Sequence, residues 1–225
     1  MLARPLTCTL FIAQLLCLSV KAQEPAVNPA LYNGREYVRY SFQVDKGHAY
    51  FLVDSFLTGS VLYDGVICDH VNLLYDEYKD ELVTTEIRGK ELVQLIKSKI
   101  DSFSIGEYKF IHLRPDASLL NIPAFGFYQI LHDGKNQVLK KEKKIIKENA
   151  GITVTFERSF ETQSSYFVRI ANRYYEVNSK KDILSLFEKN KRDISRYIKD
   201  NHLNYKKDPE ELVSRVALYA ETLTP

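Results

Sequence analysis

The stretch FLTGSVLYDGVICDHVNLLY, residues 56–75, contains the pattern that decides the fold. Two runs rich in Val, Leu, Ile and Tyr, at 56–63 and 66–75, are separated by the dipeptide Asp64-Gly65. β-Branched and aromatic residues favour strands, and Asp-Gly tolerates the positive φ that a tight hairpin requires. Strands joined by so short a connection must be antiparallel. The stretch therefore predicts a β-hairpin.

The same alternation of strand-forming runs and turn residues extends over residues 31–177. Three further turns are predicted. Gly106-Glu107 separates the strands 103–105 and 108–113, and Asp133-Gly134 separates the strands 125–132 and 135–146. Asn172-Arg173 separates the strands 166–171 and 174–177. Residues 91–105 fit either a helical stripe or two short strands, at 93–95 and 101–105, and their β-rich flanks favour strands. The pattern predicts a large antiparallel β-meander, as a curved sheet or half-barrel.

The period of the apolar residues changes after residue 177. Ser179 and Asp182 form a capping-box pattern at the start of a helix, and Asp208-Pro209 marks a second start. Two apolar stripes at helical spacing follow, made by Ile183, Phe187, Ile194 and Ile198 and by Leu212, Val216, Tyr219 and Leu223. We therefore expect an α+β fold in one domain, residues 31–225, with a β region at 31–177 and two C-terminal α-helices at 178–225.

Residues 1–22 have the features of a cleavable signal peptide. Arg4 precedes an uncharged, mostly apolar run at 6–20, and Val20-Lys21-Ala22 suits cleavage before Gln23. The run is shorter than the roughly 20 residues of a membrane-spanning helix, although an uncleaved N-terminal anchor is the alternative. Residues 23–30 contain two prolines and are predicted to form an extended leader.

Charge and cysteine content exclude two classes of protein. Loss of Arg4 and Lys21 lowers the Lys and Arg count from 31 to 29, which equals the Asp and Glu count, so the mature chain is formally neutral. A neutral chain lacks the excess positive charge that nucleic-acid binding draws on. Cys8 and Cys17 leave with the signal peptide, and Cys68 alone cannot form an internal disulfide. We expect Cys68 to be a small buried apolar residue.

Catalytic and metal-binding patterns are weak. The five histidines, at 48, 70, 112, 132 and 202, show no zinc spacing. The acidic stretch at 75–81 lacks the central glycine of a calcium loop, so Asp76 and Asp80 are predicted to cap a tight turn between strands. Ser55, Ser60 and Ser118 lie in no nucleophile motif. No catalytic, cofactor-binding or metal residue is predicted, and no cofactor.

Two features could bear on binding. The aromatic segment at 123–128 could hold a lipid if the concave face of the sheet were open, and core packing is the alternative. Basic residues could contact anionic headgroups, although such runs are usually solvated faces. They are Lys140, Lys141, Lys143 and Lys144 of the segment 140–144, and the helix residues Lys189, Lys191, Arg192, Arg196 and Lys199.

Several segments together resemble a family of exported proteins of Bacteroidetes-type bacteria whose function is unassigned. They are residues 33–37, 59–65, 74–76, 80–83 and 126–131, and the tail from Leu186-Phe187 through 204–210. The resemblance covers most of the mature chain. It implies a periplasmic or outer-envelope location and carries no catalytic residues.

The sequence favours an exported cell-envelope protein that binds a lipid or an envelope protein without catalysis. Once the signal peptide is removed, we expect neither an integral membrane protein nor a nucleic-acid partner. A hydrolytic enzyme whose site is assembled from distant residues is one alternative. A structural subunit of an envelope complex is the other.

Overall fold

The computed structural model describes residues 28–86, 89, 91–150 and 156–223. The predicted signal peptide and most of the predicted leader therefore lie outside the described residues. From Asn28 the chain does not stay extended, because it forms the 3-10 helix η1 (Pro29–Tyr32). Asn28 Oδ1 accepts a hydrogen bond from the Ala30 amide, and Pro29 suits the first helical position.

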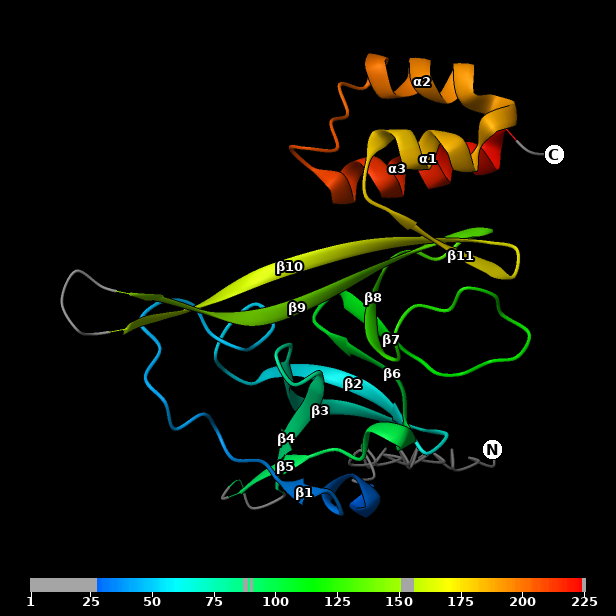
Figure 1. Ribbon diagram of the computed structural model, residues 1–225. Coiled ribbons are helices and arrows are strands. Elements are labelled where there is room, and N and C mark those ends of the chain that lie inside the picture. Colours follow the sequence, from blue (N-terminus) through cyan, green and yellow to red (C-terminus); the bar gives the residue numbers. More distant parts are fainter. Residues whose placement is uncertain (1–27, 87–88, 90, 151–155, 224–225) are drawn as a thin grey trace, which may run out of the picture.

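Within the described residues, eleven strands form one open antiparallel sheet, and α-helices follow it (Figure 1). The α+β class and the curved, unclosed sheet that the sequence predicts are confirmed. The segment 91–105 contains two short strands, as favoured, at 92–94 and 100–105, with a 3-10 turn between them. The strands are β1 (Arg35–Glu36), β2 (Leu57–Tyr63), β3 (Val66–Asp76), β4 (Glu81–Thr85), β5 (Leu92–Gln94), β6 (Ile100–Ile105), β7 (Tyr108–Leu113), β8 (Gly126–His132), β9 (Asn136–Ala150), β10 (Phe156–Ile170) and β11 (Arg173–Val177).

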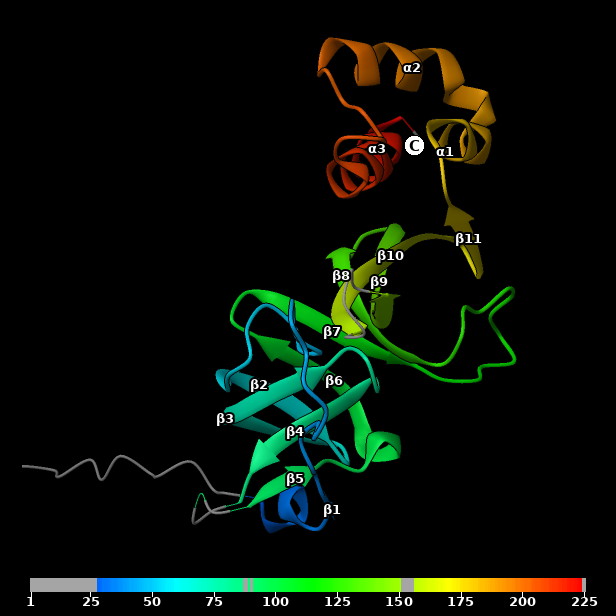
Figure 2. The same cartoon turned by 60° about the vertical axis from the view of Figure 1, so that its left-hand side comes forward.

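The strand order departs from a simple meander twice, because β1 pairs with β5 rather than β2, and β6 pairs with β2 rather than β5. The order is β1-β5-β4-β3-β2-β6-β7-β8-β9-β10-β11, so β6 pairs with β2 although β5 precedes it in the chain. The connection from β5 to β6 contains only five residues, of which Lys97–Lys99 form the 3-10 turn η2. That segment is too short for the roughly 19 Å that four strand spacings occupy in a flat sheet. The sheet must therefore coil, and Figure 2 shows β2 to β6 gathered below β8 to β10.

The predicted Asp64-Gly65 turn is confirmed, with φ angles of 53° and 77°. Two other details of the predicted hairpins need correction. The last turn lies at Ala171-Asn172 rather than Asn172-Arg173, because Arg173 already pairs with Ile170. Strand β10 is also far longer than the predicted 166–171. Its first half is mostly polar because β9 and β10 extend there as a two-stranded ribbon with little apolar cover.

Within the described residues three α-helices, rather than two, follow the sheet: α1 (Lys180–Leu186), α2 (Lys191–Asp200) and α3 (Pro209–Thr222). Helices α1 and α3 contact the strands, and α2 packs on these two helices on the side away from the sheet (Figure 1). The caps at Ser179 and Asp208 are confirmed. The first predicted helix is divided because Phe187 leaves the helical conformation before the 3-10 turn η3 (Glu188–Asn190). This break lets both α1 and α2 bury apolar residues in the core shared with β9 to β11.

The largest apolar core lies inside the coil formed by β2 to β8. It is strongly aromatic, and Phe103 and Phe110 stack with ring centroids 4.6 Å apart. Cys68 is buried in this core, which confirms its predicted structural role. Helical residues form a second core against β9 to β11. The turn between β3 and β4 lies between these two regions, and it supports the site described next.

Candidate functional site

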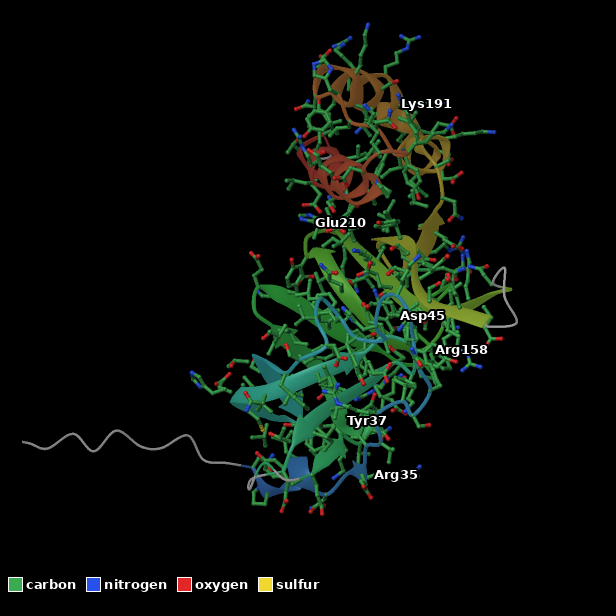
Figure 3. All side chains as sticks on the ribbon, turned by 90° about the vertical axis from the view of Figure 1, so that its left-hand side faces the viewer. Arg35, Tyr37, Asp45, Arg158, Lys191 and Glu210 are labelled. Atoms are coloured by element: carbon green, nitrogen blue, oxygen red, sulfur yellow. The ribbon has the colours of Figure 1, made fainter. Side chains whose placement is uncertain are left out.

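A long loop, residues 37–54, crosses the molecule between β1 and β2. Figure 1 shows it in blue, running from β1 up to the β9–β10 hairpin and back to β2. Backbone hydrogen bonds tie it to β5 at Tyr37, to β10 at Asp45 and Lys46, and to β3 at Phe51. Figure 3 labels Tyr37, Asp45 and Arg158 along this side of the molecule. The loop is therefore held in place at both ends and at its middle.

The loop forms one wall of a small cleft, and Phe160 on β10 forms the other. The cleft, here called the 37–54 cleft, has a volume of about 250 Å³. Its rings are closely packed: the Tyr40 centroid lies 5.3 Å from that of Phe42 and 5.9 Å from that of Phe160. It is lined by Arg39, Tyr40, Phe42, Val44, Gly47, His48, Ala49, Tyr50, Asp54 and Phe160.

A buried carboxylate beneath the cleft holds the tyrosines. Asp76 is fully buried at the end of β3. It accepts hydrogen bonds from the hydroxyls of Tyr37 at 2.7 Å and Tyr40 at 2.5 Å, and from the amides of Tyr78 and Lys79 at 2.9 Å. Four donors satisfy a buried charge that would otherwise be costly. The predicted capping role of Asp76 is confirmed, and the sequence did not indicate its bonds to Tyr37 and Tyr40.

The two tyrosines act as fixed neutral donors. Burial raises the pKa of both Tyr37 and Tyr40 well above the ordinary value, and their bonds to Asp76 raise it further. Lys79 places its ammonium 4.7 Å from the Tyr37 ring centroid and 4.6 Å from that of Tyr40. Such a cation–π contact adds to the hold on each ring. Both rings therefore have one defined orientation at physiological pH.

Cations around the cleft already have partners. Arg39 pairs with Asp54, and its guanidinium lies 5.2 Å from the Tyr50 ring centroid. Arg158 pairs with Glu148 at 2.7 Å. The opposite charges at the rim largely cancel, so the cleft favours a neutral ligand over an ionic one.

The next residue of the turn, Glu77, is buried beside Lys144 of β9. Its side chain is 2% exposed, and Oε1 has no hydrogen-bond partner among the described residues. Burial, helped by the nearby Glu142 carboxylate and opposed by Lys144, raises the pKa of Glu77 to about 7. Lys144 Nζ lies 3.6 Å from Oε2. Glu77 therefore titrates near neutral pH.

Glu77 should make stability depend on pH. In the unfolded chain its carboxyl loses the proton near pH 4.5, whereas in the folded protein it keeps the proton to about pH 7. The folded state binds more protons in this window, so the free energy of unfolding falls as the pH rises through it. Glu77→Gln copies the neutral form, and we expect it to stabilise the protein by about 3 kcal/mol at pH 8 and to have little effect at pH 4.5.

Urea unfolding of both proteins at pH 4.5 and pH 8 measures this difference. Glu107→Gln, in the exposed turn between β6 and β7, makes the same chemical change without burial and should show no pH-dependent gain. An effect of Glu77→Gln that is equal at both pH values would contradict the assignment.

Asp80, at the other end of the turn, clamps it to the middle of the sheet. It pairs with Lys141 at 2.6 Å and with Lys97, and it accepts a hydrogen bond from the Tyr75 hydroxyl at 2.7 Å. Burial acts to raise the pKa of Asp80, but Lys141 and the other donors outweigh it and lower the pKa below its ordinary value. Gly126 has to be glycine, since a Cβ there would lie 2.3 Å from Asp80 Oδ2. Asp80 thus binds neighbouring elements together rather than only capping its turn.

The basic segment 140–144 is mostly internal. Lys140 pairs with Glu210 of α3 at 2.9 Å, and Figure 3 places Glu210 on the side of the helices that faces the sheet. Lys141 and Lys144 pair with the acidic turn, as described above. The interpretation as a solvated face is therefore wrong for these three lysines, whose side chains are mostly buried. Lys143 is exposed.

The other sequence candidates lie apart from one another. His48 lines the cleft, whereas His132 contacts Glu221 of α3 at 3.0 Å. The serine hydroxyls of Ser60 and Ser118 bond to Ser104 and Asp116. In the aromatic segment Phe127 and Tyr128 belong to the core, and Phe125 is exposed. Among the described residues, no group of three or more His, Cys, Asp or Glu side chains could hold a metal ion.

None of the described helices joins enough length to enough apolar character for a membrane crossing. Comparison with protein families, with curated proteins and with solved structures gives no match for this chain. The resemblance to exported Bacteroidetes-type proteins therefore stays a prediction. Function has to be inferred from the chemistry of the site itself.

Proposed function

We propose that this chain is a non-enzymatic binding protein of the cell envelope, exported as the sequence predicts, and that the 37–54 cleft holds one neutral sugar ring. The observation that carries the proposal is the combination of half-buried aromatic rings with hydrogen-bonding groups whose charges are balanced. Tyr40, Phe42 and Phe160 are each half-buried, so part of each ring remains free for a ligand. Aromatic surface of this kind binds a flat apolar face, such as the C–H face of a sugar.

Polar groups at the rim suit hydroxyls. The Tyr50 amide donates to His48 Nδ1 at 3.2 Å, so this nitrogen is unprotonated and the ring proton lies on Nε2. His48 can thus donate one further hydrogen bond. Asp54 and Arg39 are exposed, and their ion pair leaves acceptor and donor positions unused. A sugar ring with several hydroxyls can use both these hydrogen-bond donors and these acceptors.

Size and charge favour this ligand over the lipid that the sequence analysis considered. A volume of 250 Å³ equals that of about eight water molecules, which suits one ring and is small for a lipid chain. Binding is also favoured over hydrolysis. Glycoside hydrolysis uses two carboxyl groups flanking the bond, whereas the described residues that line this cleft include one carboxylate, Asp54.

Loss of one aromatic wall should weaken binding without unfolding the protein. We expect Phe42→Ala to raise the dissociation constant for a neutral oligosaccharide about tenfold, the effect of about 1.4 kcal/mol of lost stacking. Calorimetric titration with a panel of neutral oligosaccharides measures this. Phe125→Ala removes an exposed ring outside the cleft and is the matched control.

Two outcomes would overturn the proposal. One is that no neutral oligosaccharide of the panel binds while phospholipid vesicles do. The other is that a sugar binds with the same affinity to Phe42→Ala as to the wild type.

A further inference from the structure

A second and larger cleft lies at the far edge of the sheet, where loop 114–125 meets β11 and α1. Its volume is about 590 Å³. Tyr174 and Tyr175 of β11 and Ile122 and Pro123 of the loop line it beside acidic and polar residues, so its walls combine aromatic and apolar surface with polar groups. The proposed sugar site does not share any of these residues.

The cleft exists because a short parallel pairing stops. Leu120 pairs with β11, since its amide donates to the Asn172 carbonyl at 2.7 Å and its carbonyl accepts from the Tyr174 amide at 3.0 Å. Asn121 then adopts a positive φ of 54°, which turns the chain away from β11. The structure shows no continuation of this ladder to Glu176 among the described residues.

The backbone of Glu176 is therefore directed into the cleft. Successive residues of a strand direct their amide and carbonyl groups to alternate edges. Tyr174 directs its amide outward to Leu120, so Glu176, two residues on, does the same. An edge strand with free backbone groups is the usual template for an added strand.

The negative charge of the cleft lining determines which kind of added strand it favours. Glu176 and Asp182 both line it, and its described lining residues include no Lys or Arg. Asp182 uses Oδ2 to accept from the Asn178 amide at 3.0 Å, and Glu176 is exposed. The lining therefore favours a cationic partner with apolar residues between its charges.

We propose that this cleft binds an extended segment of a partner protein, with alternating basic and apolar residues, as an added strand on β11. The segment pairs its backbone with Glu176, places its basic side chains near Glu176 and Asp182, and packs its apolar side chains on the tyrosines. This second site is independent of sugar binding.

Amide exchange of the full chain, followed by NMR, tests the proposal. The probe is a hexapeptide of alternating Lys and Val. In the free protein the Glu176 amide should exchange at least tenfold faster than that of Tyr174, and the peptide should slow it at least tenfold. A peptide of alternating Glu and Val should leave it unchanged. Slow exchange of Glu176 in the free protein, or no protection at millimolar Lys-Val peptide, would overturn the proposal.

Variants separate strand addition from simple charge attraction. Glu176→Lys should weaken the Lys-Val peptide about tenfold, whereas Glu107→Lys, in a distant exposed turn, should not. Two N-methylated forms of the peptide test the backbone pairing. Methylation of the amides on the peptide edge that faces β11 should abolish binding, whereas methylation of the amides on the other edge should leave binding intact. Equal binding of both methylated peptides would contradict an added strand. Phe42→Ala should bind the peptide normally, so failure of the sugar proposal leaves this test unaffected.

Discussion

Replacing Asp80 with alanine is expected to lower the free energy of unfolding by about 3 kcal/mol, because removal of one partner from a buried ion cluster leaves uncompensated charge. Asp80 is the common partner of Lys97 and Lys141, and its side chain is 19% exposed. Burial already lowers the pKa of Lys141, and Asp80 opposes that effect. Without Asp80, Lys141 must either lose its proton or remain charged in a poorly solvated place.

Urea unfolding at pH 7 measures the loss. Glu148→Ala is the matched control, since its pair with Arg158 at 2.7 Å is exposed on both sides and should contribute less than about 1 kcal/mol. The difference should also depend on pH. The pKa of Asp80 is lowered in the folded protein, so its contribution is present above about pH 4 and is lost as the pH falls through the folded value. Equal effects of the two variants would contradict the role given to Asp80.

Asp76→Ala should be about as damaging, and it should also abolish sugar binding. The change removes the acceptor for the hydroxyls of Tyr37 and Tyr40 and for two backbone amides. Each buried donor left without a partner costs about 1–3 kcal/mol, so we expect a loss of about 3–4 kcal/mol after some of them reach water. Tyr40 lines the cleft, so its release should remove the binding surface as well.

A combined variant distinguishes these lost hydrogen bonds from general damage. Tyr37→Phe with Tyr40→Phe removes both hydroxyl donors, so Asp76→Asn should cost less in that background than in the wild type, by about 1 kcal/mol or more. Asp69→Ala, exposed on the same strand β3, should have little effect. Urea unfolding of the four proteins of the cycle gives the coupling energy. A coupling energy near zero would show that Asp76 does not act through these hydroxyls.

The features that the sequence predicted correctly are mostly set by local patterns. Asp64-Gly65 and the caps at Ser179 and Asp208 act within a few residues, and each one is confirmed. The order of the sheet was missed, because the pairing of β6 with β2 depends on coiling of the whole sheet. The first half of β10 was missed because a two-stranded ribbon needs no alternation of apolar and polar residues.

The candidate site was less predictable than the fold. The acidic turn was recognised as a turn, and Asp76 as its cap, because those contacts are local. Its partners Tyr37 and Tyr40 lie 39 and 36 residues away in the chain, and no spacing rule connects them. The abundance of tyrosine was the one available signal. Lys141 lay in a run that looks solvated, and only the docking of the turn against β9 buries it.

Saturation-transfer NMR tests the central claim most directly, by showing which hydrogens of a bound sugar contact protein rings. With a neutral oligosaccharide that binds the full chain, the strongest saturation transfer should fall on the C–H face of a single sugar ring. This transfer should vanish in Tyr40→Ala and persist in the control Phe125→Ala. Transfer spread evenly over several sugar rings, or transfer that survives in Tyr40→Ala, would show that the 37–54 cleft is not the binding site.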